Sequence, residues 1–136
     1  MVEMGRIPIV KVADRPDTVP VVSRWLWEEW GRANGRTLEE TSVRVAARTS
    51  VSGPEQCFVL LVDEVPVATA SFVHRDLPSR PDLTPWLAGV FVQPEFRCRG
   101  FASHLVRAVE VSGRAVRILT IWLFTGSAVD LYARLG

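Results

Sequence analysis

The sequence has 136 residues, of which 48% are hydrophobic and 23% are charged, with a formal net charge of +1. This length and composition fit a single folded domain over residues 1–136 and exclude a disordered chain. The near-neutral charge and the lack of a long apolar segment give no reason to expect binding to nucleic acid or to a membrane.

The N-terminal part of the chain predicts one strand followed by two helices. Residues 7–13 alternate enough between apolar and polar side chains to form a strand. Apolar residues then recur at helical spacing over residues 21–30, and Gly31 supplies a stop. Thr37 followed by Glu40 is the pattern of a capping box, which predicts that a second helix starts there and runs to about residue 48.

The middle of the chain predicts three strands. Residues 57–62 and 66–73 are apolar and β-branched, and the short connection between them indicates an antiparallel hairpin. Residues 75–85 contain three prolines and are expected to form a loop. A third long strand is expected at residues 86–93.

The C-terminal part predicts a helix at residues 100–113, a buried strand at 116–124 and a last helix at 127–135. The full order is therefore β-α-α-β-β-β-α-β-α. This order predicts an α/β fold of the α+β type, in which helices flank a mixed, mainly antiparallel sheet. The only parallel crossover is expected between the fourth and fifth strands.

The segment with the most specific chemistry is the pattern R-x-x-G-x-A formed by Arg97, Gly100 and Ala102. It follows an apolar strand and opens a helix, whose first turn presents unpaired N–H groups and the positive end of the helix dipole. Small residues allow an anion to approach the backbone, and Arg97 and Arg99 add positive charge. The segment predicts a site for a phosphate or pyrophosphate, although a glycine that starts an ordinary surface helix is the simpler interpretation.

This segment resembles the acetyl-CoA binding motif of the GNAT superfamily of N-acyltransferases, and the order of elements also resembles that fold. Residues 127–136, with Tyr132 before Leu-Gly, resemble its fourth helix, and the chain is similar to a bacterial subgroup of the family. The resemblance implies transfer of an acetyl group from acetyl-CoA to a primary amine of a small molecule or a protein, without a metal. Two cysteines and no apolar leader add the expectation of a cytoplasmic protein.

The resemblance also implies roles for individual residues. Tyr132 is expected to be the general acid for the departing thiolate, although a core contact is its alternative. The expected acetyl-CoA contacts comprise the strand before the motif, the motif loop and a threonine that replaces a frequent asparagine. They are Val90, Phe91, Val92, Arg97, Cys98, Arg99, Gly100, Phe101, Ala102, Ser103 and Thr125.

The general base stays open, because the expected strands at residues 86–93 and 116–124 contain no acidic residue. The remaining candidates are acidic residues and a histidine in the first helix and the proline-rich loop. They are Glu28, Glu29, His74, Asp76 and Asp82.

Relatives usually continue beyond the point that corresponds to Gly136, so we expect the strand at residues 116–124 to lack a neighbour. An open apolar edge favours a homodimer or another edge-strand association. Two alternatives to the enzyme therefore stay open. One is a weak or inactive acyl-CoA-binding module that a partner chain completes, and the other is a scaffold without a ligand.

Overall fold

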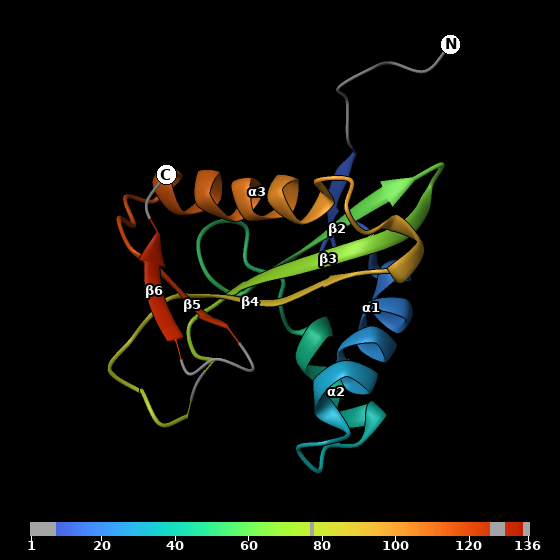
Figure 1. Cartoon of the computed structure of the whole chain (residues 1–136), viewed down its shortest axis with the longest axis horizontal. Helices are drawn as coiled ribbons and strands as arrows, with labels where there is room; N and C mark the ends of the chain where they lie inside the picture. The colour runs from blue at the N-terminus through green and yellow to red at the C-terminus, as the bar shows by residue number, and fades with distance from the viewer. Residues whose placement is uncertain (1–7, 77, 126–129, 135–136) are drawn as a thin grey trace.

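The described part of the chain contains one mixed sheet, in which the strands lie side by side in the order in which they occur in the sequence (Figure 1). The computed structural model describes residues 8–76, 78–125 and 130–134. All neighbouring strands pair antiparallel except β4 and β5, which pair parallel. The strands are β1 Ile9–Lys11, β2 Gln56–Val62, β3 Val65–Val73, β4 Trp86–Val92, β5 Ile121–Thr125 and β6 Asp130–Arg134.

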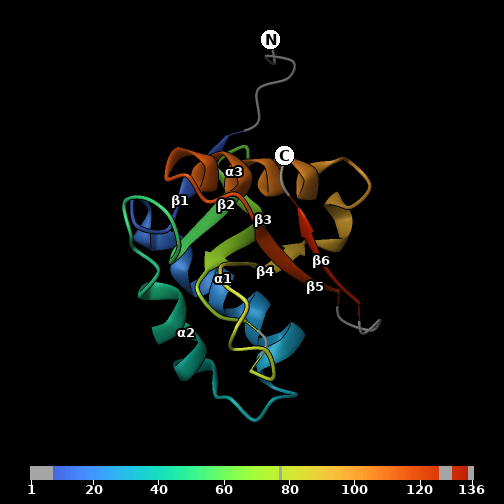
Figure 2. The ribbon, with the colours of Figure 1, turned by 90° about the vertical axis from the view of Figure 1, so that its left-hand side faces the viewer.

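Helices cover both faces of this sheet. Figures 1 and 2 show α3 along one face, whereas α1 and α2 pack against the other. A π-helical turn, η2, continues α1 directly, and two short 3-10 turns, η1 and η3, precede α1 and α3. The helical segments are η1 Pro16–Thr18, α1 Val19–Leu26, η2 Trp27–Gly31, α2 Leu38–Ala46, η3 Pro94–Phe96 and α3 Phe101–Ala115.

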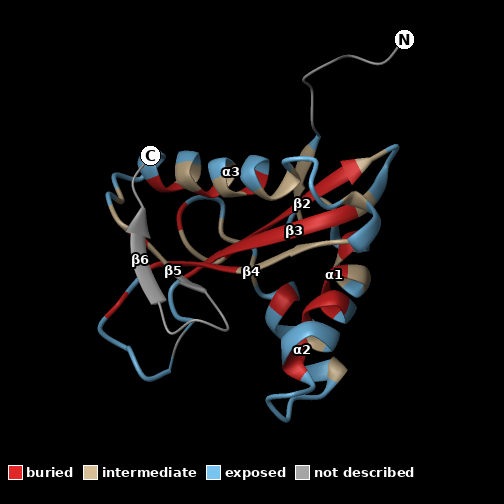
Figure 3. Ribbon diagram, in the orientation of Figure 1, coloured by how far each residue is buried: buried red, intermediate tan, exposed pale blue. Residues whose placement is uncertain are grey.

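The alternation of side chains along β2 produces a core on each face of the sheet. Phe58 and Leu60 pack in one cluster with Leu105 of α3. Val59, between them in sequence, packs in the other cluster with Val22 of α1. Burial on both faces explains why the strand reads as a continuous apolar run, and Figure 3 shows β2 and β3 as the most buried strands.

The capping box predicted at the start of the second helix is present. The hydroxyl of Thr37 accepts a hydrogen bond from the Glu40 N–H at 3.0 Å. The Thr37 N–H in turn donates to Glu40 Oε1 at 2.8 Å. Two N–H groups at the helix end are thereby satisfied, which fixes the start of α2 at Leu38.

The expected fold class is confirmed, including the parallel crossover from β4 to β5, but the last helix is wrong. Residues 130–134 form strand β6, in which Tyr132 pairs with Leu123 of β5. The expected unpaired edge of the fifth strand is therefore also wrong, because β6 occupies it. Pairing with an open apolar strand satisfies backbone groups that a helix in this position would leave free. The outer strands of the described sheet are β1 and β6.

The fifth strand is shorter than the pattern at residues 116–124 predicts, because it starts at Ile121. The preceding residues form the turn that ends α3. Arg117 has a positive φ of 63°, and the Ile118 N–H donates to the Gly113 carbonyl at 2.9 Å. The apolar residues before Ile121 therefore connect the end of α3 to β5 and do not belong to the strand.

Gly113 also has a different role from the helix stop that we expected, because α3 continues to Ala115. A Cβ atom at Gly113 would lie 3.0 Å from Cδ1 of Ile121 and 3.5 Å from Cζ of Phe72. The absent side chain therefore allows α3 to approach the sheet closely where β5 begins.

Candidate functional site

The strand β4 separates from β5 halfway along its length. It pairs with β5 only at Trp86 and Leu87, whereas its pairing with β3 continues to Val92. Beyond Leu87, the β4 backbone groups that face away from β3 have no neighbouring strand in the described sheet. An extended ligand can pair with such groups as an added strand would.

A bulge bends β4 at the point of separation. Ser71 of β3 pairs with Ala88, but Thr69 pairs with Phe91, so β4 contains one extra residue between these pairs. Gly89 lies in the bulge with a φ of 60°, a left-handed conformation that costs glycine little. The residues that follow the bulge, Val90 to Val92, line the same cleft as the start of α3.

The N-terminus of α3 is open to an external anion. Its N-cap residue is Gly100, at a φ of 78°, and no side chain caps this end. A Cβ atom at Gly100 would meet no protein atom within 4 Å, so the space beside it is free. Cys98, in the loop before this helix end, is exposed and has a positive φ of 65°. The first N–H groups of α3 are thus directed at open space.

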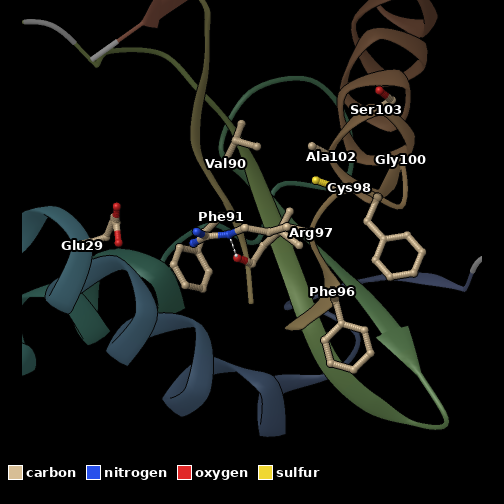
Figure 4. Close-up of a pocket in the computed structure, with 11 residues that line it drawn as sticks. Glu29, Val90, Phe91, Phe96, Arg97, Cys98, Gly100, Ala102 and Ser103 are labelled. Atoms are coloured by element: carbon tan, nitrogen blue, oxygen red, sulfur yellow. Dashed lines mark hydrogen bonds between the residues drawn. The ribbon is translucent and has the colours of Figure 1, made fainter. Parts of the chain in front are cut away.

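A cleft of about 460 Å³ joins the separated strand to this helix end. Figure 4 shows Glu29 on one side, β4 in the centre and the α3 loop on the other side. The lining residues come from η2, β4, η3 and the start of α3. They are Glu29, Val90, Phe91, Val92, Phe96, Arg97, Cys98, Gly100, Phe101, Ala102 and Ser103.

The structure brings most of the expected cofactor contacts together in this cleft, but Arg99 and Thr125 are not among its lining residues. Arg99 lies over the ring of Phe96, with Cζ 5.1 Å from the ring centroid. Thr125 is the last residue of β5, and its side chain lies outside the described residues.

Arg97 lies across β4. Its Nε donates to the Val92 carbonyl at 2.9 Å, and its guanidinium lies 5.7 Å from the centroid of the Phe91 ring (Figure 4). The guanidinium is therefore held at the cleft, in the centre of the lining residues.

The sequence motif does not reveal the contribution of Phe96. This residue precedes the motif arginine, lines the cleft and stacks on Phe101, with ring centroids 6.4 Å apart. The stacked pair links η3 to the first residue of α3 and supports the loop between them.

The five candidates for a general base differ in their position relative to the cleft. Glu29 lines the cleft, while Glu28 forms an ion pair with Arg24 at 3.6 Å. Asp82 is bound by Arg80, whose hydrogen bond lowers the pKa of that carboxyl. Of the five, Glu29 alone lines the cleft.

His74 and Asp76 lie after the end of β3, outside the lining of the cleft. The His74 N–H donates to a carboxylate oxygen of Glu55 at 2.7 Å. Asp76 has an exposed surface, but the protein atoms around it desolvate the carboxyl and raise its pKa. The positive charges of Arg48, Arg36 and Arg44 oppose this rise.

Tyr132 lies on β6 instead of a helix, opposite Leu123. Its side chain lies outside the described residues, so its expected role as the general acid stays a prediction.

No helix in the described ranges is long and apolar enough to cross a membrane. Within the same ranges, no group of three or more histidine, cysteine or acidic residues is arranged to hold a metal ion.

Comparison with known proteins gives a family and a set of similar folds. The model of the Acetyltransferase (GNAT) family matches residues 19–136, whereas a search of the curated proteins found no match. The solved structure of the aminoglycoside N-acetyltransferase AAC(6')-Iy in complex with CoA is similar, with a TM-score of 0.67 at 20% identity. The similarity covers 93% of this chain and 82% of that one.

Two further structures show the same fold. AAC(6')-Iy in complex with the bisubstrate analog CoA-S-monomethyl-acetylneamine has a TM-score of 0.66 at 21% identity, over 90% of this chain and 82% of that one. A Pyrococcus horikoshii protein classified as an acetyltransferase has a TM-score of 0.64 at 15% identity. The match covers 93% of this chain but 41% of the Pyrococcus protein, so the chain spans less than half of that protein's length.

Proposed function

Because the chain belongs to the Acetyltransferase (GNAT) family, we propose that it transfers an acetyl group from acetyl-CoA to a primary amine. The observation that carries this proposal is the separation of β4 from β5 beside the uncapped start of α3. An extended acyl-pantetheine chain fits unpaired strand groups, and a pyrophosphate fits free helix N–H groups. The open space beside Gly100 leaves room for a phosphate to approach the backbone.

The residues that would hold acetyl-CoA follow from these positions. Those backbone groups of Val90, Phe91 and Val92 that bind neither β3 nor Arg97 pair with the pantetheine arm, and the N–H groups of residues 98–103 bind the pyrophosphate. Arg97 adds a positive charge at the cleft, where its bond to the Val92 carbonyl holds it.

Acetyl-CoA supplies an activated acetyl group, so the transfer forms a C–N bond and breaks a C–S bond. We propose direct attack by the amine, with no covalent intermediate on the protein. The nitrogen must lose protons and the sulfur must gain one. Glu29, exposed at the cleft, accepts the first proton from the ammonium group directly or through water. Tyr132 donates a proton to sulfur, and the second proton lost by nitrogen returns to the phenolate through water.

A second candidate function is an acyl-CoA-binding module with weak or no activity. It is favoured by the absence of an acidic residue from β4 and β5, and it does not need a partner chain to pair with β5, because β6 already does so. Release of CoA thiol from acetyl-CoA in the presence of a panel of primary amines separates the two functions. Thiol release that depends on an amine supports the enzyme. Tight binding of acetyl-CoA without release by any amine supports the module.

A further inference from the structure

The first helix ends in a π-helical turn, and Glu29 lies in the middle of that turn. Helix α1 continues directly into η2, which spans Trp27–Gly31. The Arg32 N–H donates to the Trp27 carbonyl at 2.8 Å, five residues back, whereas an α-helix would use the carbonyl of Glu28. One extra residue is thereby inserted into the helix. Single π-helical turns of this kind are frequent at functional sites.

One side of this helix faces the cleft. The ring of Trp25 lies 5.4 Å from the ring of Phe91, a cleft residue of β4, measured between centroids. Glu29 follows Trp25 by four residues, and side chains at this spacing lie on the same side of a helix. Glu29 lines the cleft, on the side away from the α3 loop (Figure 4). The continuation of α1 therefore presents Glu29 to the space beside β4.

Trp27 makes its contacts away from the cleft. It precedes Glu29 by two residues, and positions two apart do not share a helix face. Its Nε1 donates to the Arg36 carbonyl at 2.8 Å, in the loop that leads to α2. The guanidinium of Arg32 lies over its ring, with Cζ 4.3 Å from the centroid. Trp27 thus attaches the π-helical turn to the segment that follows it.

Gly31 brings the same turn against α2. Gly31 is buried, and a Cβ atom there would lie 3.0 Å from Oγ1 of Thr41 and 3.1 Å from Cδ1 of Trp27. Thr41 is itself buried within α2. The Gly31 carbonyl accepts a hydrogen bond from the Arg36 N–H at 2.9 Å. The turn is therefore closely packed where Trp27 and Gly31 meet α2, and Glu29 alone of its residues lines the cleft.

Trp27 does not fill the hydrophobic core. Among the described residues, the core clusters include its neighbours Trp25 and Leu26 but not Trp27. Its hydrogen bond and its ring contact are both made to residues 32–36, directly after the turn. These contacts act on the turn that carries Glu29.

We propose that Trp27 is a positioning residue for acetyl transfer: it holds the π-helical turn so that Glu29 projects into the cleft, where the acceptor amine binds. This inference rests on the proposed function, with Glu29 as the base. Proton transfer requires the carboxylate within hydrogen-bond reach of the amine, so a small displacement of Glu29 lowers kcat. The proposed acetyl-CoA contacts come from β4 and the start of α3 and do not depend on Trp27.

Trp27→Phe tests this role, because it keeps an aromatic ring but removes the donor to Arg36. With the most active amine of the panel, kcat from release of CoA thiol should fall about tenfold or more, while calorimetry should show unchanged acetyl-CoA affinity. Gly31→Ala, which forces Trp27 or Thr41 to move, should act in the same way. Trp30→Phe is the matched control and should retain kcat. Trp30 lies in the same turn, is exposed and, in the described part of the chain, has no hydrogen-bond partner for its Nε1.

A double variant shows whether Trp27 acts through Glu29. In the Glu29→Gln background, Trp27→Phe should cause no further loss of kcat, because the base is already absent. Losses that multiply would mean that Trp27 affects activity by another route and would overturn the proposal, as would unchanged kcat in both Trp27→Phe and Gly31→Ala. If Glu29→Gln itself retains kcat, the base and the positioning role both fail, while acetyl transfer stands.

If no amine is acetylated, the proposed function fails, and crystal structures of Trp27→Phe and Trp30→Phe decide on the positioning role. Movement of Glu29 out of the cleft in Trp27→Phe alone would support it. An unmoved Glu29 in Trp27→Phe, or equal movement in both variants, would overturn it.

Discussion

Leu87 and Leu123 form the last pair between β4 and β5, and the two strands separate beyond them. Leu87 is buried with Leu105 of α3 in the core beneath the sheet, and Leu123 packs against that cluster. The separation therefore starts from a firmly packed point. Beyond it, the β4 backbone has free groups within reach of the uncapped start of α3, and this arrangement is the basis of the proposed acetyl-CoA site.

The bulge at Gly89 should be needed for this site. Gly89→Ala places a side chain at a φ of 60°, and the left-handed conformation should reduce the free energy of unfolding by about 1 to 2 kcal/mol. It should also weaken acetyl-CoA binding, because relief of the strain changes the path of β4. Gly35→Ala is the matched control, since Gly35 also has a positive φ of 78° but lies outside the cleft lining. Urea denaturation and calorimetry measure the two effects, and equal acetyl-CoA affinity in both variants would contradict a role for the bulge.

Glu29→Gln tests the proposed base. The variant keeps the size of the side chain but loses the proton acceptor, so kcat should fall by about 100-fold or more while acetyl-CoA affinity is retained. Glu28→Gln, which removes only an exposed ion pair with Arg24, should retain kcat. Release of CoA thiol, followed over a range of pH values, measures kcat and its pH profile for both variants. Unchanged kcat and an unchanged pH profile in Glu29→Gln would exclude Glu29 as the base.

Asp76 should make the stability of the protein depend on pH in a defined direction. Desolvation raises the pKa of its carboxyl in the folded state above the ordinary value of 3.8. The folded state therefore holds this proton more tightly than the unfolded state, and ionisation reduces stability as the pH rises through the raised pKa.

Asp76→Asn mimics the protonated carboxyl, so at pH 7 the variant should have the higher free energy of unfolding. The difference should decrease as the pH falls toward 3.8, where the carboxyl becomes protonated in both states. Urea denaturation at several pH values measures it. A wild-type protein that is more stable at pH 7 would mean that attraction by Arg48, Arg36 and Arg44 outweighs desolvation.

Local signals in the sequence were sufficient to predict most of the helices and strands. The capping box of Thr37 and Glu40 involves residues three apart, and the apolar strands β2 and β3 are joined by a short turn. The R-x-x-G-x-A motif predicted an open helix end because Gly100 and the first turn of α3 are adjacent in the chain.

The features that sequence reasoning missed depend on contacts between distant segments. Residues 127–135 carry a helical pattern, but the free edge of β5 favours a strand at 130–134. Gly113 resembled a helix stop because its close approach to Ile121 depends on how α3 lies on the sheet. The arginines that act on Asp76 could not be recognised, since Arg36, Arg48 and Asp76 come together only through folding.

The central claim is that the start of α3 binds the pyrophosphate of acetyl-CoA, and isothermal titration of acetyl-CoA tests it most directly. Gly100→Glu places a carboxylate in the free space beside the helix end, whereas Gly35→Glu places the same side chain at an equal φ of 78° outside the cleft lining. We predict micromolar-range binding by the wild-type protein and by Gly35→Glu, and a loss of about tenfold or more in Gly100→Glu, through charge repulsion at the site. Equal affinity of Gly100→Glu and Gly35→Glu, or no binding by the wild-type protein, would contradict the account.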